Sequence, residues 1–130
     1  MEGQNVIDAS SSLQTCENLM MIQQLAREFA KKELRPVVMK YDESQEFPLE
    51  VIAKLAELGF LGATVPEEYN GAGLTPLDFT VLVEEISKVD PSIGLSLCAH
   101  NGLCVAHIFQ YGNDAQRRKY LPELCSGKRL

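Results

Sequence analysis

Apolar residues recur at three- and four-residue steps along most of the chain, and this spacing predicts a succession of amphipathic helices. The first set at helical spacing is Leu19, Ile22, Leu25 or Ala26, and Phe29. It predicts a helix over residues 16–35, capped by Thr15 and interrupted at Pro36, because proline disfavours helical backbone at the residue before it. The polar, serine-rich residues 1–15 precede this pattern and are expected to form a frayed or disordered tail.

Two further helices are predicted over residues 48–59 and 75–90, since each has a proline in its first turn and apolar residues on one face. Between them, residues 61–66 are expected to be extended. Residues 67–74 are expected to form a loop, because asparagine and two glycines there accept positive φ at little energetic cost.

The most apolar segment covers residues 93–109 and is apolar nearly all round, so both of its faces are expected to be buried. Small residues within it permit either close helix packing or a cavity beside the backbone; they are Gly94, Ser96, Ala99 and Gly102. Leu95, Ala99 and Leu103 share one face that could wall an apolar ligand slot, although the residues alone favour helix packing. A last helix is expected over residues 113–127.

No convincing strand pattern is present, so the chain is predicted to be all-α, a multi-helix bundle forming one domain over residues 16–130. The composition, 45% hydrophobic and 23% charged over 130 residues, is ordinary for a soluble globular domain. A formal net charge of −6 argues against nucleic-acid binding. No apolar run approaches the length of a membrane span, and four cysteines without a secretory leader are expected to be free thiols.

Residue groups that could carry chemistry fit simpler interpretations better. His100, Cys104 and His107 have the types and spacing of zinc ligands, but no fourth ligand or oxyanion donor is indicated and the following Asn-Gly pair can break the helix. Neither a metal site nor a nucleophile is therefore predicted. The paired carboxylates Glu84 and Glu85 fit a solvated helix face, and the Gly-x-Gly loop lacks the third glycine of a dinucleotide fingerprint.

Several motifs follow one another in a fixed order. They are Arg27-x-Phe29-Ala30 with Glu33-Leu34-x-Pro36, Phe47-Pro48, Leu55-Ala56-Glu57-Leu58-Gly59-Phe60-Leu61-Gly62, Val65-Pro66-Glu67-Glu68-Tyr69-Asn70-Gly71-Ala72-Gly73-Leu74, Glu84-Glu85-Ile86-Ser87, Gly94-Leu95-Ser96 with Ala99-His100-Asn101, and Tyr111-Gly112 with Gln116-Arg117-x-Lys119-Tyr120-Leu121-Pro122. From about Leu19 to the end, this order and spacing resemble the N-terminal helical domain of the acyl-CoA dehydrogenases. Asn70 departs from the family pattern, where glycine is common, but asparagine also tolerates a left-handed backbone.

The resemblance implies a flavoenzyme that removes the α proton of an acyl-CoA thioester while the β hydrogen leaves as hydride to FAD. In that family the catalytic glutamate and the flavin-contacting segments lie in later domains, so the resemblance implies no catalytic, cofactor-binding or metal-binding residue within this chain. The chain looks like the first third of such an enzyme and is not expected to be active alone. By position, Leu95, Ala99 and Leu103 would border the acyl chain, with a short or branched acyl group as substrate.

The resemblance also implies partners for the parent enzyme: an acyl-CoA substrate, an electron-transferring flavoprotein, the remaining domains of the same enzyme, and a dimeric or tetrameric homo-oligomer. Its implied location is the cytoplasm in a bacterium or the mitochondrial matrix in a eukaryote. The alternative is a stand-alone helical interaction module without enzymatic activity. The two differ in surface: a domain built to face other domains is expected to expose an apolar patch, whereas an independent module is expected to cover its apolar residues.

Overall fold

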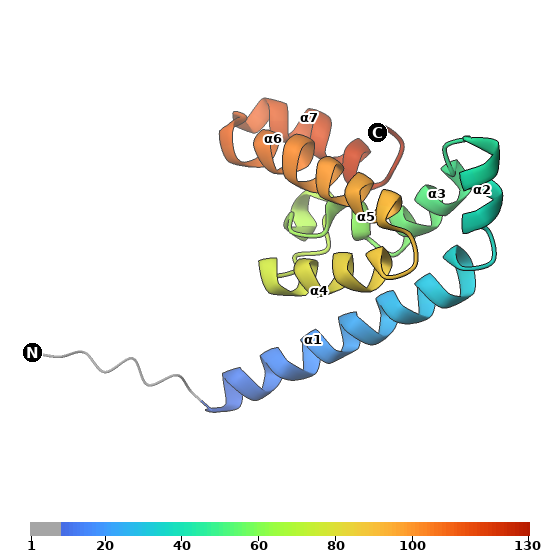
Figure 1. Cartoon of the computed structure of the whole chain (residues 1–130). Coiled ribbons are helices and arrows are strands. Elements are labelled where there is room, and N and C mark those ends of the chain that lie inside the picture. Colours follow the sequence, from blue (N-terminus) through green and yellow to red (C-terminus); the bar gives the residue numbers. More distant parts are fainter. Residues whose placement is uncertain (1–8) are drawn as a thin grey trace, which may run out of the picture.

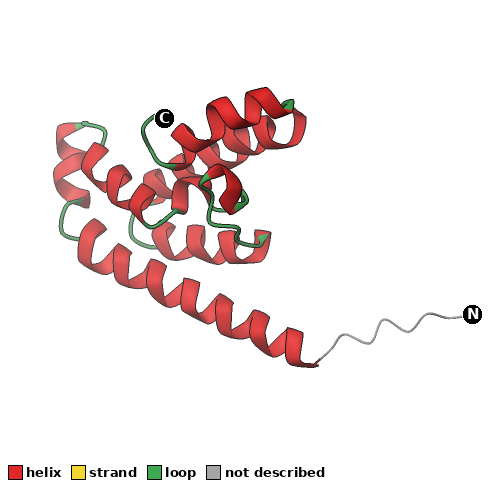
Figure 2. Ribbon diagram, turned by 180° about the vertical axis from the view of Figure 1, so that it is seen from behind, coloured by secondary structure: helices red, strands yellow, loops and turns green. Residues whose placement is uncertain are grey.

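The regular structure of the chain is helical throughout the described part, which in this computed structural model is residues 9–130, with side chains from residue 14 onward. The α-helices are α1 (Ala9–Phe29), α2 (Val38–Ser44), α3 (Leu49–Glu57), α4 (Pro76–Ser87), α5 (Pro91–Cys98), α6 (Ala106–Tyr111) and α7 (Asp114–Cys125). Two π-helical segments are η1 (Ala30–Leu34) and η4 (Ala99–Val105), and two 3₁₀ turns are η2 (Phe60–Gly62) and η3 (Glu67–Tyr69). The all-α class predicted from the sequence is confirmed (Figure 2).

The helices form a layered bundle (Figure 1). Helix α1 runs along one side and packs against α4, and α4 packs against α5. Helices α5, η4 and α6 follow one another without interruption, because the backbone stays right-handed helical at Cys98 and Ala106 where they join. Helix α7 returns beside α6 and covers the turns η2 and η3.

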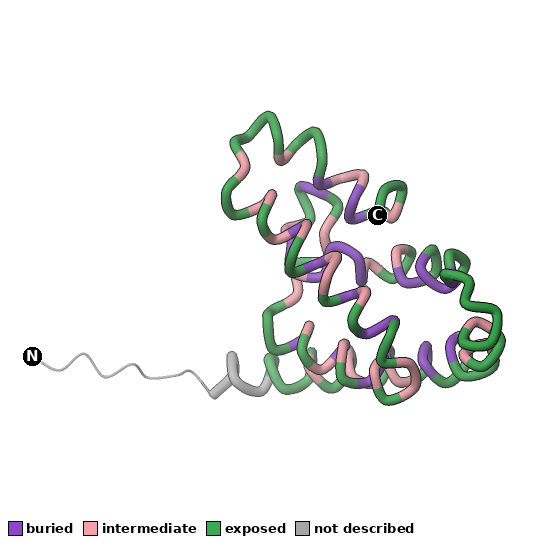
Figure 3. The backbone as a smooth tube through the Cα atoms, turned by 45° about the horizontal axis from the view of Figure 1, so that its top comes forward, coloured by how far each residue is buried: buried purple, intermediate pink, exposed green. Residues whose placement is uncertain are grey.

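Two apolar clusters hold these elements together, and buried residues lie along the inner sides of the helices (Figure 3). The larger cluster joins α1, η1, α3, η2, α4 and α5; its most buried large side chains are Leu34, Leu55, Phe60, Leu61, Leu82, Ile86, Ile93 and Leu97. The smaller cluster joins η3, η4 and α7 through Val65, Tyr69, Val105, Leu121, Leu124 and Cys125. Burial of aliphatic and aromatic surface is thus the main stabilising contribution.

The first helix begins earlier than the sequence pattern predicts. Helix α1 starts at Ala9, so Thr15 lies within it and is not its cap. The expected tail falls partly on residues 1–8, which lie outside the described residues. The interruption expected at Pro36 is confirmed, because η1 ends at Leu34 and α2 begins at Val38.

The segment expected to be extended is instead a series of tight turns. Gly59 adopts φ 78°, and the chain then forms η2. Backbone carbonyls of this turn region accept hydrogen bonds from the loop that follows η3, including Leu74 N–H to Ala63 O at 2.8 Å. Gly71 is needed for this close approach, because an added Cβ would lie 1.9 Å from Val65 O. Pairing across a loop of this kind carries no periodic pattern, which is why the sequence did not reveal it.

The expectation that both faces of the apolar segment are buried is wrong for this chain. Ile93, Leu97 and Val105 are almost completely buried, but Leu95 is 71% and Leu103 73% exposed. The whole helix, Pro91–Tyr111, reaches the length and apolar composition of a membrane span, contrary to the expectation from the sequence. One helix of this kind is weak support for a span, because a core helix meets the same criteria.

Candidate functional site

The three residues singled out from the sequence lie on the outward side of the continuous helix α5–η4. Leu95 and Leu103 are both more than 70% exposed, and Ala99 between them is partly buried. The opposite side of the same helix packs into the core through Ile93 and Leu97. We call Leu95, Ala99 and Leu103 the apolar stripe; the structure brings them together on one face, as their four-residue spacing predicts.

Helix α5 is held close to α4 by a small residue. An added Cβ at Gly94 would lie 1.9 Å from Ser87 Oγ, so this glycine allows the two helices to approach. At Gly102 an added Cβ would meet no atom within 4 Å. Of the two alternatives left open by the sequence, close packing therefore holds at Gly94 and open space at Gly102.

Asn101 is a functional candidate that sequence reasoning missed. Its side chain is 2% exposed and makes three hydrogen bonds. The amide nitrogen donates to Phe60 O at 3.0 Å and to Leu97 O at 3.1 Å, and the amide oxygen accepts from Ala63 N–H at 3.0 Å. The helix does not break at Asn101-Gly102 but continues as the π-helical η4. A lone amide inside an otherwise apolar helix is the feature of the sequence that could have identified it.

The residues considered as metal ligands point to separate partners. His100 Nε2–H donates to Leu124 O at 3.2 Å, and burial lowers the pKa of His100, which favours the neutral imidazole. His107 Nδ1–H donates to Gly102 O at 3.1 Å. In the described part of the chain, no group of three or more histidine, cysteine or acidic side chains could hold a metal ion.

An apolar cavity of about 400 Å³ lies between α6 and α7, and a smaller one lies beside the helix α5–η4. The smaller one, about 290 Å³, is lined by Phe47, Ile52, Leu61, Ser96, His100, Cys104 and Leu130. This cavity lies between α3 and the helix α5–η4, next to the apolar stripe. The imidazole of His100 is hydrogen-bonded to backbone and so is already occupied.

The interpretation of Glu84 and Glu85 as two solvated carboxylates is wrong for Glu85. Its side chain is 3% exposed and lies between α1 and α4, where it accepts hydrogen bonds from Arg27 at 3.0 and 3.1 Å, Gln23 at 2.9 Å and Lys88 at 2.9 Å. The bonds from Arg27 and the other donors outweigh desolvation and lower the pKa of Glu85 to about 2. This carboxylate fastens α1 to α4 and does not face the apolar stripe.

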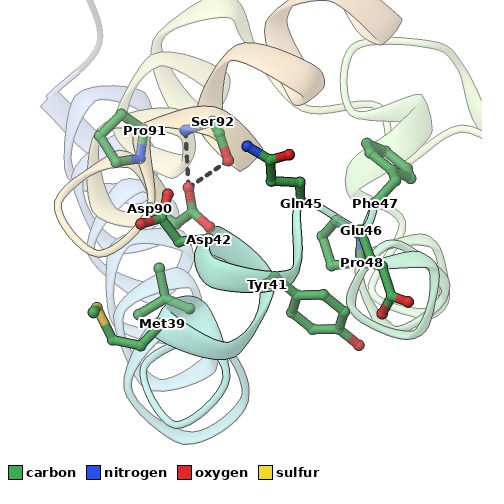
Figure 4. Close-up of a pocket in the computed structure, with 11 residues that line it drawn as sticks. Met39, Tyr41, Asp42, Gln45, Glu46, Phe47, Pro48, Asp90, Pro91 and Ser92 are labelled. Atoms are coloured by element: carbon green, nitrogen blue, oxygen red, sulfur yellow. Dashed lines mark hydrogen bonds between the residues drawn. The ribbon is translucent and has the colours of Figure 1, made fainter.

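A groove of about 700 Å³ lies between the α2–α3 connection and the α4–α5 turn (Figure 4). Three carboxylates, of Asp42, Glu46 and Asp90, line it. The Asp90 carboxylate caps α5, accepting from Ser92 N–H at 2.9 Å and from Ser92 Oγ–H at 2.6 Å. Helix capping accounts for the carboxylate of Asp90, and no feature of the sequence had pointed to this groove.

Within the described residues, these observations define the class of protein: an all-helical domain that exposes an aliphatic stripe and holds no group of three or more histidine, cysteine or acidic side chains that could bind a metal ion. The chain belongs to the family described as acyl-CoA dehydrogenase, N-terminal domain, whose model matches residues 17–128. The resemblance of the sequence motifs to that domain is thereby confirmed.

Individual relatives agree with this assignment. The short-chain-specific acyl-CoA dehydrogenase of Clostridium acetobutylicum is 37% identical over 110 residues, which is 85% of this chain and 29% of that protein. The solved structure of butyryl-CoA dehydrogenase from Megasphaera elsdenii has a TM-score of 0.79 and 32% identity, covering 100% of this chain and 32% of that one. A chain in a structure of the electron-transferring flavoprotein of Acidaminococcus fermentans has a TM-score of 0.83 and 39% identity, covering 88% and 30%. The chain thus spans about a third of its relatives' length.

Proposed function

We propose that the chain is the N-terminal domain of a flavin-dependent acyl-CoA dehydrogenase and forms one wall of its acyl-chain pocket. The observation that carries the proposal is the apolar stripe of Leu95, Ala99 and Leu103, exposed on a helix that is otherwise anchored in the core. A rigid aliphatic surface of this kind suits the methylene groups of an acyl chain. Each methylene removed from water contributes about 0.8 kcal/mol to binding.

The residues of this chain contact the acyl chain and keep water away from it. They do not perform the redox step. FAD supplies the hydride acceptor when it is bound in the complete enzyme. The side chains of the apolar stripe are aliphatic and offer no hydrogen-bond donor, so this surface fits an acyl tail and not the polar ring or phosphates of FAD. The catalytic base and the flavin contacts are therefore assigned to other parts of the enzyme.

A short or branched acyl group is the substrate that the stripe favours. Leu95 is bulky, and its projection from the wall shortens the space available to a chain lying along the stripe. Two of the relatives carry short-chain or butyryl specificity in their names. One methylene changes discrimination by about 1–3 kcal/mol, so the preference is expected to be graded across chain lengths.

The proposed partners follow from the same assignment. They are the acyl-CoA substrate, the remaining domains of the enzyme, a further copy or copies of it in a dimer or tetramer, and an electron-transferring flavoprotein as electron acceptor. The exposed leucines argue against a stand-alone interaction module, because an independent bundle covers such residues. The proposed location is the cytoplasm in a bacterium or the mitochondrial matrix in a eukaryote.

Absorbance of the full-length protein that carries this chain tests the proposal. The purified protein is expected to be yellow, and anaerobic addition of butyryl-CoA is expected to bleach the flavin band. The 130-residue chain alone is expected to be colourless and to leave butyryl-CoA unchanged. A folded full-length protein that is colourless, or whose flavin no acyl-CoA of any length bleaches, would contradict the assignment.

A further inference from the structure

We propose that Asn101 is a positioning residue for the acyl-chain wall: it holds η4 in π-helical register, and this register places Leu103 in line with Leu95 and Ala99. The inference rests on the function proposed above and adds to it a residue that does not itself face the stripe. Asn101 acts through the backbone, and Leu103 makes the contact with the acyl chain.

The amide of Asn101 ties the helix to a neighbouring turn at two points. It donates to Phe60 O at 3.0 Å and accepts from Ala63 N–H at 3.0 Å, and both partners belong to the chain segment around η2. Its other amide proton goes to Leu97 O at 3.1 Å, four residues earlier on the same helix. Because the side chain is 2% exposed, water cannot replace these bonds if the amide is removed.

The bond to Leu97 O joins the last turn of α5 to the wide turn that follows it. In an α-helix that carbonyl accepts the backbone N–H four residues later, which is the N–H of Asn101 itself. The side-chain amide competes for the same carbonyl, as polar side chains commonly do. The next turn then closes over five residues, since Ala106 N–H bonds to Asn101 O.

The wide turn changes the direction in which Leu103 points. In an α-helix a step of four residues overshoots a full turn by about 40°, so two steps rotate a side chain by about 80°. A π-helical turn holds more residues, so the four-residue step from Ala99 to Leu103 falls short of a full turn and offsets the overshoot of the α-helical step from Leu95 to Ala99. The result is visible in the burial pattern: Leu95 and Leu103 are exposed to 71% and 73%, and Leu97 and Val105, two residues after each, are exposed to 0% and 1%.

The test uses the full-length enzyme and compares Asn101→Ala with Glu85→Gln. The second variant removes the charge of a buried side chain that joins α1 to α4, away from the stripe. For each protein, kcat/KM is measured with butyryl-CoA and with octanoyl-CoA, together with the melting temperature. Asn101→Ala is expected to change the butyryl-to-octanoyl ratio by about tenfold, the size of one altered apolar contact, whereas Glu85→Gln leaves the ratio within about twofold.

Three outcomes decide the proposal. If Asn101→Ala lowers the melting temperature as Glu85→Gln does but leaves the ratio unchanged, Asn101 is merely structural and the proposal is overturned. If Asn101→Ala does not fold, Asn101→Leu is judged by the same ratio, because its side chain fills a similar space but cannot donate to Leu97 O. Failure of both variants to fold overturns the proposal, since the residue then serves folding and not position.

A third variant, Leu103→Ala, separates this inference from the proposed function. A changed ratio in Leu103→Ala with an unchanged ratio in Asn101→Ala removes only the role of Asn101. Unchanged ratios in both, in an enzyme that still oxidises acyl-CoA, remove the apolar stripe from the acyl-binding site. A crystal structure of Asn101→Ala is expected to show η4 converted to α-helix, with Leu103 rotated away from the line through Leu95 and Ala99.

Discussion

The buried carboxylate of Glu85 gives the sharpest prediction about stability. Replacing it by Glu85→Gln keeps the shape of the side chain but removes the charge that accepts hydrogen bonds from Arg27 and Lys88. The contact joins α1 to α4, and α1 is the outermost long helix of the bundle. We therefore expect the substitution to weaken the attachment of α1 and lower the free energy of unfolding.

The size of the effect follows from the pKa. A fall from 4.5 to about 2 corresponds to about 3 kcal/mol of extra stability at neutral pH, if the unfolded chain has the ordinary value. The cationic partners are 41% and 51% exposed, so solvent screens the interaction, and a loss of about 1–2 kcal/mol is the expected result. Because the folded-state pKa is depressed, this stability is fully present above about pH 4.5 and is lost as pH falls towards 2.

Urea denaturation of the 130-residue chain at a series of pH values from 7 to 3 measures this difference. The gap between wild type and Glu85→Gln is expected to shrink to less than half over that range. Glu84→Gln is the matched control, because Glu84 is 59% exposed and its pairing with Lys88 contributes about 0.5 kcal/mol or less. A gap of the same size at pH 3 and pH 7, or an equal loss in both variants, would refute the reasoning.

Three further predictions concern the cap, the helix contact and the thiols. Thr75→Ala removes the side-chain acceptor of the capping box with Asp78 and is expected to cost about 1 kcal/mol in urea denaturation; no loss would show that the cap does not stabilise α4. Gly94→Ala places a Cβ against Ser87 and is expected to lower stability by about 1–3 kcal/mol, with partial recovery in the double variant with Ser87→Gly; a neutral Gly94→Ala would contradict the close contact of α4 and α5. Burial raises the pKa of the Cys125 thiol to about 11, so iodoacetamide at pH 8 is expected to alkylate the exposed Cys16 and Cys98 first, as read by peptide mass spectrometry; equal labelling of Cys125 would contradict its burial.

Much of the fold could be predicted because helical periodicity and capping residues are local features of the sequence. The helices that begin after Thr75 and Asn113 start where the sequence indicates, each with a capping box. The boundaries that failed depend on longer-range contacts. The turn region after Gly59 is paired with a loop about ten residues later, and no periodic pattern reports such a pairing.

The candidate site was predictable only in part, for a related reason. Spacing placed Leu95, Ala99 and Leu103 on one face, but it could not indicate which face of an all-round apolar helix would remain uncovered. The roles of Glu85 and Asn101 were not predicted, because whether a polar side chain is solvated or buried depends on what lies opposite it in the fold. In both cases the partners come from about 40 to 60 positions away in the sequence.

The central claim, that helix α5–η4 is a wall of the acyl-chain pocket, is tested most directly by photocrosslinking in the full-length enzyme. A butyryl-CoA analogue with a diazirine at the end of its acyl chain is bound, irradiated and followed by tryptic peptide mapping. The label is expected in the peptide of residues 89–117, at Leu95, Ala99 or Leu103. Labelling that is competed by butyryl-CoA but falls wholly outside this peptide would contradict the account.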